Sequence, residues 1–240
     1  RDKLVTGVQT CALPISAAEA GAASAAMMAV AISVPADRPL VVGRVGQPLV
    51  AAAVVAVTPI STTTFRSEAV VAGHRMTAVV TVRSARAGDD EAIDDVIVRA
   101  FGGHDEAQLV AQLRRDGDTA ISLVAVAGEA VIGHVLLSPM SAPFRALGLA
   151  PLSVAPKHQR QGVGAALIDA AIIQARHGGW SAIFVLGDPV YYGRFGFRTD
   201  LAAGFLSPYA GPHFMMLPLA NELPATTGRI AYAAAFGSLG

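Results

Sequence analysis

A glycine-rich turn carries the clearest chemical signal in the sequence. It reads QRQGVG from Gln159 to Gly164 and lies between a predicted strand that ends at Val154 and a predicted helix that begins near Val163. The first N–H groups of a helix have no intrahelical partner and lie at the positive end of the helix dipole. Glycine also lets the main chain approach a ligand closely. The turn therefore predicts a site for a phosphate or pyrophosphate group, with Arg160 as a candidate charged contact.

Two tyrosines and one histidine are the candidates for acid–base chemistry. Tyr191 and Tyr192 open the segment YYGRFGF, and the ordinary pKa of a tyrosine is about 10. His134 lies on a predicted strand, and an ordinary histidine titrates with a pKa of about 6.5. The alternative interpretations are structural: a tyrosine that completes the core, and a strand histidine packed among apolar neighbours.

The spacing of apolar residues after Met76 predicts the elements that hold these groups. Apolar runs with turn signals between them predict strands at 79–83, 120–127, 130–138, 145–154, 181–186 and 213–219. Helical periodicity with acidic starts and glycine ends predicts helices at 89–101, 105–115, 163–176 and 189–195. The resulting order, βααβββαβαβ, is typical of a single mixed α/β domain.

Three local features predict details of these elements. Gly128-Glu129 between two strands predicts a two-residue type II′ hairpin. Pro151 lies inside the strand 145–154 and has no N–H to donate, so this strand should be bulged or locally unpaired. Asp188 directly precedes Pro189, which predicts that its carboxylate caps the following helix.

Three motifs, in this order along the chain, resemble those of the GNAT (N-acetyltransferase) superfamily. They are Leu152-Ser153-Val154-Ala155-Pro156 followed by Gln159-x-x-Gly162-x-Gly164, then Val185-Leu186-Gly187-Asp188-Pro189, then Tyr191-Tyr192-Gly193-Arg194-Phe195-Gly196-Phe197. The likeness covers residues 79–219 and is strongest to a branch whose substrates are mostly undefined. It implies a GNAT-like domain with a central mixed, mostly antiparallel sheet flanked by helices, acetyl-CoA as co-substrate and no metal.

The resemblance also implies roles for individual residues. The turn would hold the CoA pyrophosphate, the pantetheine arm would pair with the strand edge at 152–154, and the N–H of Val154 or its neighbour would stabilise the oxyanion. Tyr192 matches the family tyrosine that protonates the leaving thiolate, with Tyr191 as the alternative. The cofactor-binding residues are predicted to be Leu152, Ser153, Val154, Gln159, Arg160, Gln161, Gly162, Val163, Gly164 and Ala165.

The general base is left open by the same comparison. Many GNAT members use a glutamate on the strand that corresponds to 145–154, and here this strand contains no acidic residue. His134, on the preceding strand, is the remaining candidate by residue type. The base is therefore an open assignment, with His134 as the catalytic hypothesis.

The implied function is acyl transfer. An acetyl group would move from acetyl-CoA to an amine of an unidentified small molecule or peptide, by direct attack in a ternary complex. The missing strand acid keeps a second class open, a catalytically weak CoA-binding sensor or interaction module. The regions expected to select the acceptor, 101–115 and 201–212, carry no decisive charge pattern. A homodimer is one expected assembly.

The composition of the chain limits which partners it is expected to bind and in which cellular compartment it is expected to lie. Eighteen Lys and Arg balance eighteen Asp and Glu, which gives no net attraction to nucleic acid or to an anionic membrane. The single cysteine, Cys11, excludes an internal disulfide framework and a cysteine-rich metal site. The stretch 20–36 is too short and too weakly apolar to predict a membrane span. These features favour a cytoplasmic protein.

The first 75 residues differ in character from the rest. Residues 1–16 resemble a peptide translated from sequencing-adapter DNA, which would place Cys11 outside the natural protein. Residues 17–75 are rich in Ala and Val and are predicted to be non-native or disordered, with Met76 as the natural start. The N-acetyltransferase domain is predicted to span residues 76–240.

Overall fold

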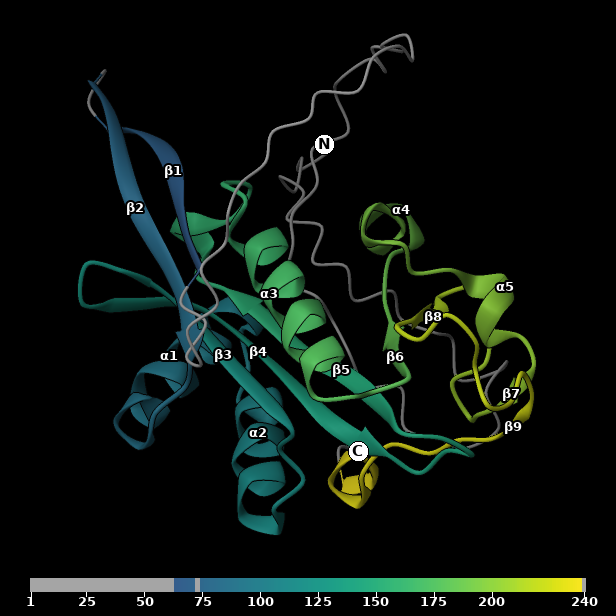
Figure 1. Cartoon of the computed structure of the whole chain (residues 1–240). Coiled ribbons are helices and arrows are strands. Elements are labelled where there is room, and N and C mark those ends of the chain that lie inside the picture. The colour runs from purple at the N-terminus through teal and green to yellow at the C-terminus, as the bar shows by residue number, and fades with distance from the viewer. Residues whose placement is uncertain (1–62, 72–73, 239–240) are drawn as a thin grey trace, which may run out of the picture.

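The fold is organised around a mixed sheet (Figure 1). The computed structural model describes residues 63–71 and 74–238. Its strands are β1 (Thr63–Val71), β2 (His74–Ser84), β3 (Ile121–Ala127), β4 (Ala130–Met140), β5 (Ala146–Val154), β6 (Ala182–Leu186), β7 (Phe205–Leu206), β8 (Phe214–Pro218) and β9 (Gly228–Arg229). The large sheet has seven strands in the order β1-β2-β3-β4-β5-β6-β8, and β7 pairs with β9 in a small second sheet. Within the large sheet, neighbouring strands are antiparallel except β5 and β6, which are parallel.

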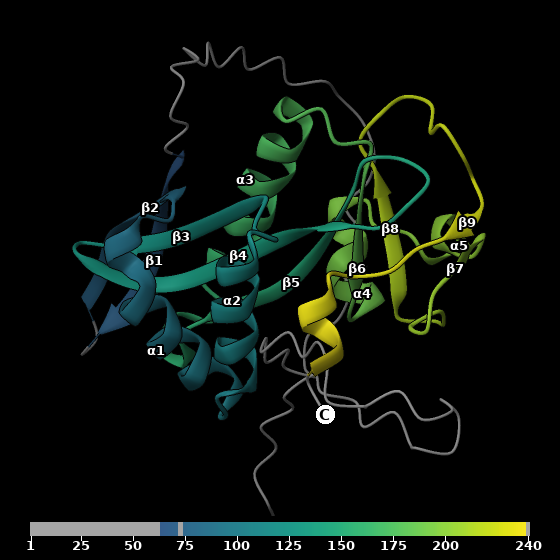
Figure 2. The ribbon, with the colours of Figure 1, turned by 90° about the horizontal axis from the view of Figure 1, so that it is seen from below.

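Helices cover both faces of the large sheet. They are α1 (Asp90–Phe101), α2 (Asp105–Asp116), α3 (Val163–His177), α4 (Pro189–Tyr192) and α5 (Thr199–Ala202), with 3-10 turns η1 (Ala87–Asp89), η2 (Pro156–His158), η3 (Gly193–Phe195) and η4 (Ala234–Ser238). Figure 2 shows α3 on one face and α1 and α2 on the other. The C-terminal turn η4 lies beside α2 on that second face (Figure 2).

The helices form where helical periodicity and end signals coincide. In α1, Ile93 and Ile97 recur one turn apart and are fully buried against the sheet. Gly102 then ends the helix with a φ of 79°, a left-handed conformation that favours glycine. In α3, Leu167 and Ile168 are fully buried in the cluster that joins this helix to the sheet. Each helix therefore presents one apolar face to the sheet.

The α/β class and the central, mostly antiparallel sheet with flanking helices are confirmed. The predicted order βααβββαβαβ lacks four observed elements: β1, α5, β7 and β9. The strands β7 and β9 have two residues each, too few to show the period-two pattern of a strand. The predicted strand 213–219 is therefore the last strand of the large sheet, and one short strand follows it.

The strand β1 corrects an expectation about the N-terminal region. Thr63–Val71 pairs antiparallel with β2, so this part of the segment 17–75 belongs to the sheet instead of an unstructured leader. Met76 lies inside β2 and does not precede the first strand. Because the whole segment 17–75 is rich in Ala and Val, its composition does not distinguish the strand at its end from the residues before it. Residues 1–62, with Cys11 and the adapter-like peptide, lie outside the described residues.

The three local predictions agree with the structure. Gly128 has a φ of 61° while Glu129 does not adopt a positive φ, as a type II′ hairpin requires. The register between β4 and β5 shifts between Val135 and Leu137, opposite the segment that contains Pro151. The Asp188 carboxylate accepts a hydrogen bond of 2.8 Å from the N–H of Val190 and so caps α4.

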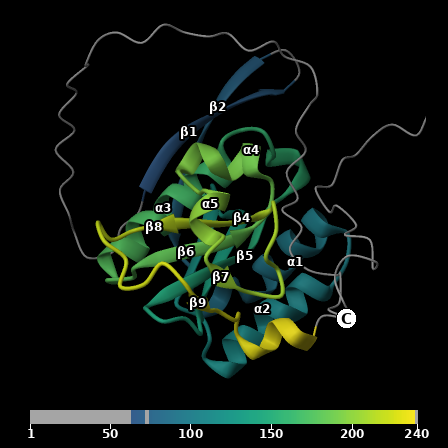
Figure 3. The ribbon, with the colours of Figure 1, turned by 90° about the vertical axis from the view of Figure 1, so that its right-hand side faces the viewer.

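After β9 the chain returns across the sheet face that carries α1 and α2 (Figures 2 and 3). Ser141 and Ala231 form an isolated bridge whose two N–H···O bonds are both 2.9 Å. The segment ends in η4, which packs beside α2. We call residues 230–238 the return segment. Because Ile230, Ala235 and Phe236 are buried, this segment is part of the hydrophobic core. None of the helices in the described residues is long and apolar enough to span a membrane.

Candidate functional site

The strands β5 and β6 pair at one end and then separate. Their pairing runs from Ala146 opposite Ala182 to Gly148 opposite Phe184. From Leu149 to the end of β5, no described strand pairs with the edge that faces β6. Figure 1 shows the two strands diverging from their paired ends. The unpaired edge of β5 leads directly towards the glycine-rich turn.

Backbone donors of β5 point towards this open edge. The N–H of Ala155 donates to Ile132 O on the β4 side (2.9 Å), and N–H directions alternate along a strand. The N–H groups of Leu152 and Val154 therefore point away from β4, towards the open edge. The carbonyl of Val154 accepts a hydrogen bond of 3.0 Å from Nε2 of Gln159. The edge thus keeps two donors for an extended ligand, while Gln159 covers its last acceptor.

The turn before α3 collects further backbone donors. Arg160 has a φ of 61° and Gly162 a φ of 84°, and left-handed residues of this kind turn successive N–H groups into a shared concave surface. The first helical bond runs from Ala166 N–H to Gly162 O (3.0 Å), so the N–H groups of residues 163–165 have no intrahelical partner. The N-cap residue, Gly162, has no side chain to cap these groups. The helix start therefore offers main-chain donors that could bind an anion.

The side chains around the turn hold its shape. Gln161 donates through Nε2 to Lys157 O (2.8 Å), as Gln159 does to Val154 O. Gly133 on β4 lets α3 approach: an added Cβ there would lie 3.0 Å from Leu167 Cδ1 and 3.1 Å from Val163 Cγ1. Gln159 and Gln161 were predicted to bind the cofactor. In the structure their side chains donate to backbone carbonyls and so stabilise the turn that presents the backbone N–H groups.

Tyr192 lies at the end of α4 and is fully buried, at 0% exposure. Its ring packs over Gly187, where an added Cβ would lie 2.5 Å from the ring Cε2. Its hydroxyl has no hydrogen-bond partner among the residues that the structure describes. Burial, followed by the hydroxyls of Tyr191 and Tyr232, raises the pKa of Tyr192 well above its ordinary value. The group is therefore a buried, protonated and unengaged donor.

Tyr191 has different surroundings from its neighbour. The Arg194 guanidinium lies 4.5 Å from the centre of its ring. Burial raises the pKa of Tyr191 to about 12, the charge of Arg194 opposes this rise, and Asp169 of α3 adds to it. Tyr191 thus faces Arg194, whereas the hydroxyl of Tyr192 is buried without a partner in the described residues. The geometry favours Tyr192 of the two adjacent tyrosines.

His134 lies on the α1–α2 face of β4 and is fully buried. Its Nε2 shares a hydrogen bond of 3.0 Å with Ser122 Oγ, and its Nδ1 has no partner in the described part of the chain. Burial, with the positive charge of Arg114, lowers the pKa of His134 to about 3. Its cross-strand neighbour Ser153 is also fully buried, and Ser153 Oγ donates to His134 O (3.4 Å). These contacts favour a structural role for both side chains.

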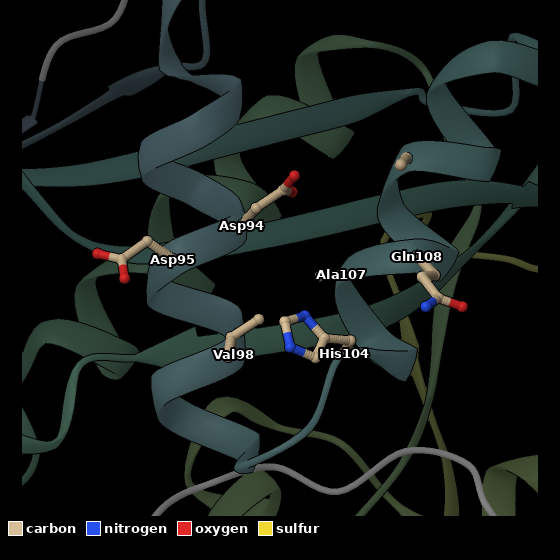
Figure 4. A pocket seen from close by; sticks show the side chains of 7 residues that line it. Asp94, Asp95, Val98, His104, Ala107 and Gln108 are labelled. Atoms are coloured by element: carbon tan, nitrogen blue, oxygen red, sulfur yellow. The ribbon is translucent and has the colours of Figure 1, made fainter.

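A hollow of about 350 Å³ lies between α1 and α2 (Figure 4). It is lined by Asp94, Asp95, Val98, His104, Ala107, Gln108 and Ala111. Burial raises the pKa of Asp94, an effect that Arg114 partly opposes. No lining residue belongs to β5 or β6, so the hollow is separate from the open strand edge. It falls partly in the region 101–115, where acceptor selection was expected.

Sequence reasoning missed Gly187 as part of the site. The glycine was noted in a motif, but the reason for it is tertiary, because its missing Cβ makes room for the Tyr192 ring. Phe197 is buried in the core, with its ring 5.6 Å from that of Tyr192. The signal that could have identified Gly187 is its place directly after the buried strand β6.

Comparisons with known proteins agree with this geometry. The model of the Acetyltransferase (GNAT) family matches residues 91–197. The uncharacterized N-acetyltransferase YhbS of Escherichia coli K12 is 40% identical over 151 residues, which cover 60% of this chain and 90% of the relative. The uncharacterized N-acetyltransferase YjhQ of the same strain is 36% identical over 171 residues, 65% of this chain and 92% of the relative.

Two solved structures are similar in both sequence and fold. The crystal structure of YhbS from Escherichia coli in complex with CoA has a TM-score of 0.62 and 31% identity, covering 67% of this chain and 93% of that one. A GNAT family acetyltransferase from Brucella melitensis in complex with acetyl-CoA has a TM-score of 0.55 and 31% identity, covering 65% of this chain and 97% of that one.

Proposed function

The chain belongs to the GNAT acetyltransferase family, and from this premise we propose that it transfers an acetyl group from acetyl-CoA to an amine. The observation that carries the proposal is the open edge of β5, which leads into the glycine-capped start of α3. An extended ligand with an anionic end fits this combination of strand edge and helix start. The similar proteins solved with CoA and acetyl-CoA support the same ligand.

In the proposed complex, the main chain holds the donor. The N–H groups of residues 163–165 bind the pyrophosphate, and Arg160, within the turn, is the candidate for a charged side-chain contact. The pantetheine arm pairs with the N–H groups of Leu152 and Val154, in the way that an added strand would. One of these two donors also faces the thioester carbonyl and stabilises its negative charge in the transition state.

The chemical step is direct attack in a ternary complex. The amine nitrogen bonds to the thioester carbon, the C–S bond breaks, and the thiolate leaves. The Tyr192 hydroxyl donates its hydrogen bond and then its proton to the sulfur, and it recovers a proton from the nitrogen, which must lose one. The raised pKa of Tyr192 keeps the hydroxyl protonated before the reaction. Because it also makes the hydroxyl a weaker acid, the proton passes to the sulfur as the proton of the nitrogen returns to the phenol oxygen. No general base is assigned, so the acceptor enters as a neutral amine.

The donor-binding role of the turn predicts a large effect for Gly162→Ala. Gly162 has a φ of 84° and no atom within 4 Å of an added Cβ, so alanine introduces backbone strain without a clash. We expect the Kd for CoA, measured by calorimetry, to rise about tenfold, the equivalent of one lost charge-assisted hydrogen bond. Stability should fall by about 1 kcal/mol.

Gly117→Ala is the matched control for this substitution. Gly117 ends α2 with a φ of 77° and also has no atom within 4 Å of an added Cβ, so it carries the same kind of strain away from the turn. We expect a similar loss of stability with unchanged CoA affinity. Equal CoA affinity in the two variants would contradict the role of the turn.

A CoA-binding module without turnover is the second candidate function. It is favoured by the strand β5, which has no acidic residue, and by the buried, neutral state of His134. The experiment that separates the two incubates the full chain with acetyl-CoA and a panel of aliphatic, aromatic and peptide amines. Free thiol and acetylated product, the latter by mass spectrometry, are both followed. Amine-dependent release of both supports the enzyme, whereas tight CoA binding without release supports the module.

A further inference from the structure

Tyr232, from the C-terminal return segment, lies where β5 and β6 begin to separate. Its ring packs on Gly148: an added Cβ at this glycine would lie 2.4 Å from Cε1 and 2.7 Å from Cδ1 of the tyrosine. Gly148 is also the last residue of β5 that pairs with β6, opposite Phe184. The absence of a side chain at Gly148 therefore gives Tyr232 a place at the point of separation.

The fold holds Tyr232 firmly in this place. The preceding residue, Ala231, exchanges two hydrogen bonds of 2.9 Å with Ser141, next to the end of β4. The ring of Phe236 lies 4.9 Å from the Tyr232 ring, and the ring of Tyr209 meets it edge-on at 5.5 Å. The ring is therefore held over Gly148 by the backbone bonds of Ala231 and by contacts with the rings of Phe236 and Tyr209.

The hydroxyl of Tyr232 is buried and unengaged. The residue as a whole is partly exposed, but its hydroxyl oxygen is buried and has no hydrogen-bond partner in the described residues. Ser138 faces Gly148 across the β4–β5 ladder, and its Oγ is likewise buried without a described partner. Buried polar groups are normally hydrogen-bonded, so these two hydroxyls, from residues on either side of Gly148, are each available to a further partner.

The two tyrosines approach the strand separation from different sides. Tyr192 belongs to the apolar cluster that includes α3, whereas Tyr232 packs against the two clusters that include Phe236 and Phe184. The Tyr192 ring contacts Gly187, three residues after Phe184, and Phe184 is the β6 residue that pairs with Gly148 beneath the Tyr232 ring. A ligand between β5 and β6 would therefore meet one hydroxyl from each face of the sheet.

We propose that the hydroxyl oxygen of Tyr232 accepts a hydrogen bond from the acceptor amine, and that the return segment forms the acceptor side of the acyl-transfer site. This inference rests on the proposed acetyltransferase function. A neutral amine has N–H donors and one lone pair, so donating an N–H to Tyr232 leaves the lone pair free for the thioester carbon. The Tyr192 hydroxyl then donates to the leaving sulfur, and the Tyr232 hydroxyl oxygen accepts a hydrogen bond from the attacking nitrogen.

Tyr232→Phe in the full chain tests the proposal, because phenylalanine keeps the ring over Gly148 and removes only the hydroxyl. The probe is acetyl-CoA with the best amine of the panel. We expect kcat/KM for the amine to fall about tenfold, the loss of one hydrogen bond in the transition state. The Kd for CoA, the melting temperature and the slow hydrolysis of acetyl-CoA without amine should stay unchanged, since none of them involves the amine.

Tyr209→Phe is the matched control, since it removes a hydroxyl from the ring that packs edge-on against Tyr232. It should leave kcat/KM for the amine unchanged. An unchanged kcat/KM in Tyr232→Phe, or an equal fall in the two variants, would overturn the inference alone. A parallel loss of CoA affinity would also overturn it, because it would mean a structural effect. No amine transfer by the unsubstituted chain would overturn the proposed function, and the inference with it.

Discussion

Tyr192→Phe is expected to lower kcat for acetyl transfer by about a hundredfold to ten-thousandfold, the range for loss of a positioned general acid. The hydroxyl of Tyr192 is buried, protonated and without a partner in the described chain, beside Gly187 at the end of β6. Phenylalanine fills the same volume and keeps the contact with Phe197. The leaving thiolate would lose its proton donor, while the CoA-binding backbone stays intact.

The same substitution separates catalysis from stability. An unsatisfied buried hydroxyl costs free energy in the folded state, and an apolar replacement of the same shape removes that cost. We therefore expect the melting temperature of Tyr192→Phe to be equal to or above that of the unsubstituted chain, while the Kd for CoA is unchanged. A fall in both activity and melting temperature would instead mark Tyr192 as a core residue.

Tyr191→Phe is the control within the same helix. Tyr191 packs under Arg194, and burial holds its pKa at about 12. This variant should keep kcat within about threefold, because its hydroxyl is not the proton donor in the proposed step. Thiol release by all three proteins at saturating acetyl-CoA is the measurement. A larger loss in Tyr191→Phe than in Tyr192→Phe would transfer the assignment to Tyr191.

Acid is expected to destabilise the fold through His134. Burial and Arg114 lower the pKa of His134 to about 3, whereas the histidine of the unfolded chain titrates with a pKa of about 6.5. Below pH 6.5 the unfolded chain binds a proton that the folded chain does not bind. This histidine's contribution to stability is therefore fully present above pH 6.5 and is lost progressively as the pH falls towards 3. The loss approaches about 1.4 kcal/mol per pH unit.

His134→Gln removes this titration while keeping a group that can bond to Ser122. We expect the free energy of unfolding, from urea titrations between pH 7 and 5, to fall less steeply in this variant. At pH 5 the difference in loss should be about 2 kcal/mol. His104→Gln, which removes an exposed imidazole, is the control. Identical pH slopes for the unsubstituted chain and His134→Gln would refute the buried neutral state.

The buried state of His134 also bears on the missing general base. A neutral imidazole whose conjugate acid has a pKa of about 3 holds a proton too weakly to take one from an amine at neutral pH. Its position on the α1–α2 face, bonded to Ser122, suits the packing of that face. The residue type suggested a base, and the tertiary environment favours a structural histidine.

Local signals predicted the strands, helices and turns well where one residue controls the backbone. Gly102 and the Gly128-Glu129 pair mark a helix end and a hairpin, and both have the expected backbone conformation. Pro151 predicted an interruption of β5, and the β4–β5 register shifts opposite it. These predictions succeeded because steric limits on φ and the lack of a proline N–H act within a few residues.

Elements without a strong local pattern were not predictable in this way. The strand β1 lies at the end of an Ala- and Val-rich segment, and it is defined by its pairing with β2. The strands β7 and β9 have two residues each and are defined by their pairing with each other. Tyr232 had no motif around it, since its position depends on the bridge between Ser141 and Ala231. Such features depend on contacts between distant parts of the chain.

The sequence by itself therefore determined a glycine turn at a helix start, after a strand interrupted by proline, and these features indicated the family and the proposed co-substrate. The tertiary structure decided what surrounds the proposed site. It separated β5 from β6, buried His134, distinguished Tyr192 from Tyr191 and brought Tyr232 to Gly148. The physical reason is that backbone conformation follows from neighbours in the chain, whereas burial, pKa and hydrogen-bond partners follow from packing between distant segments.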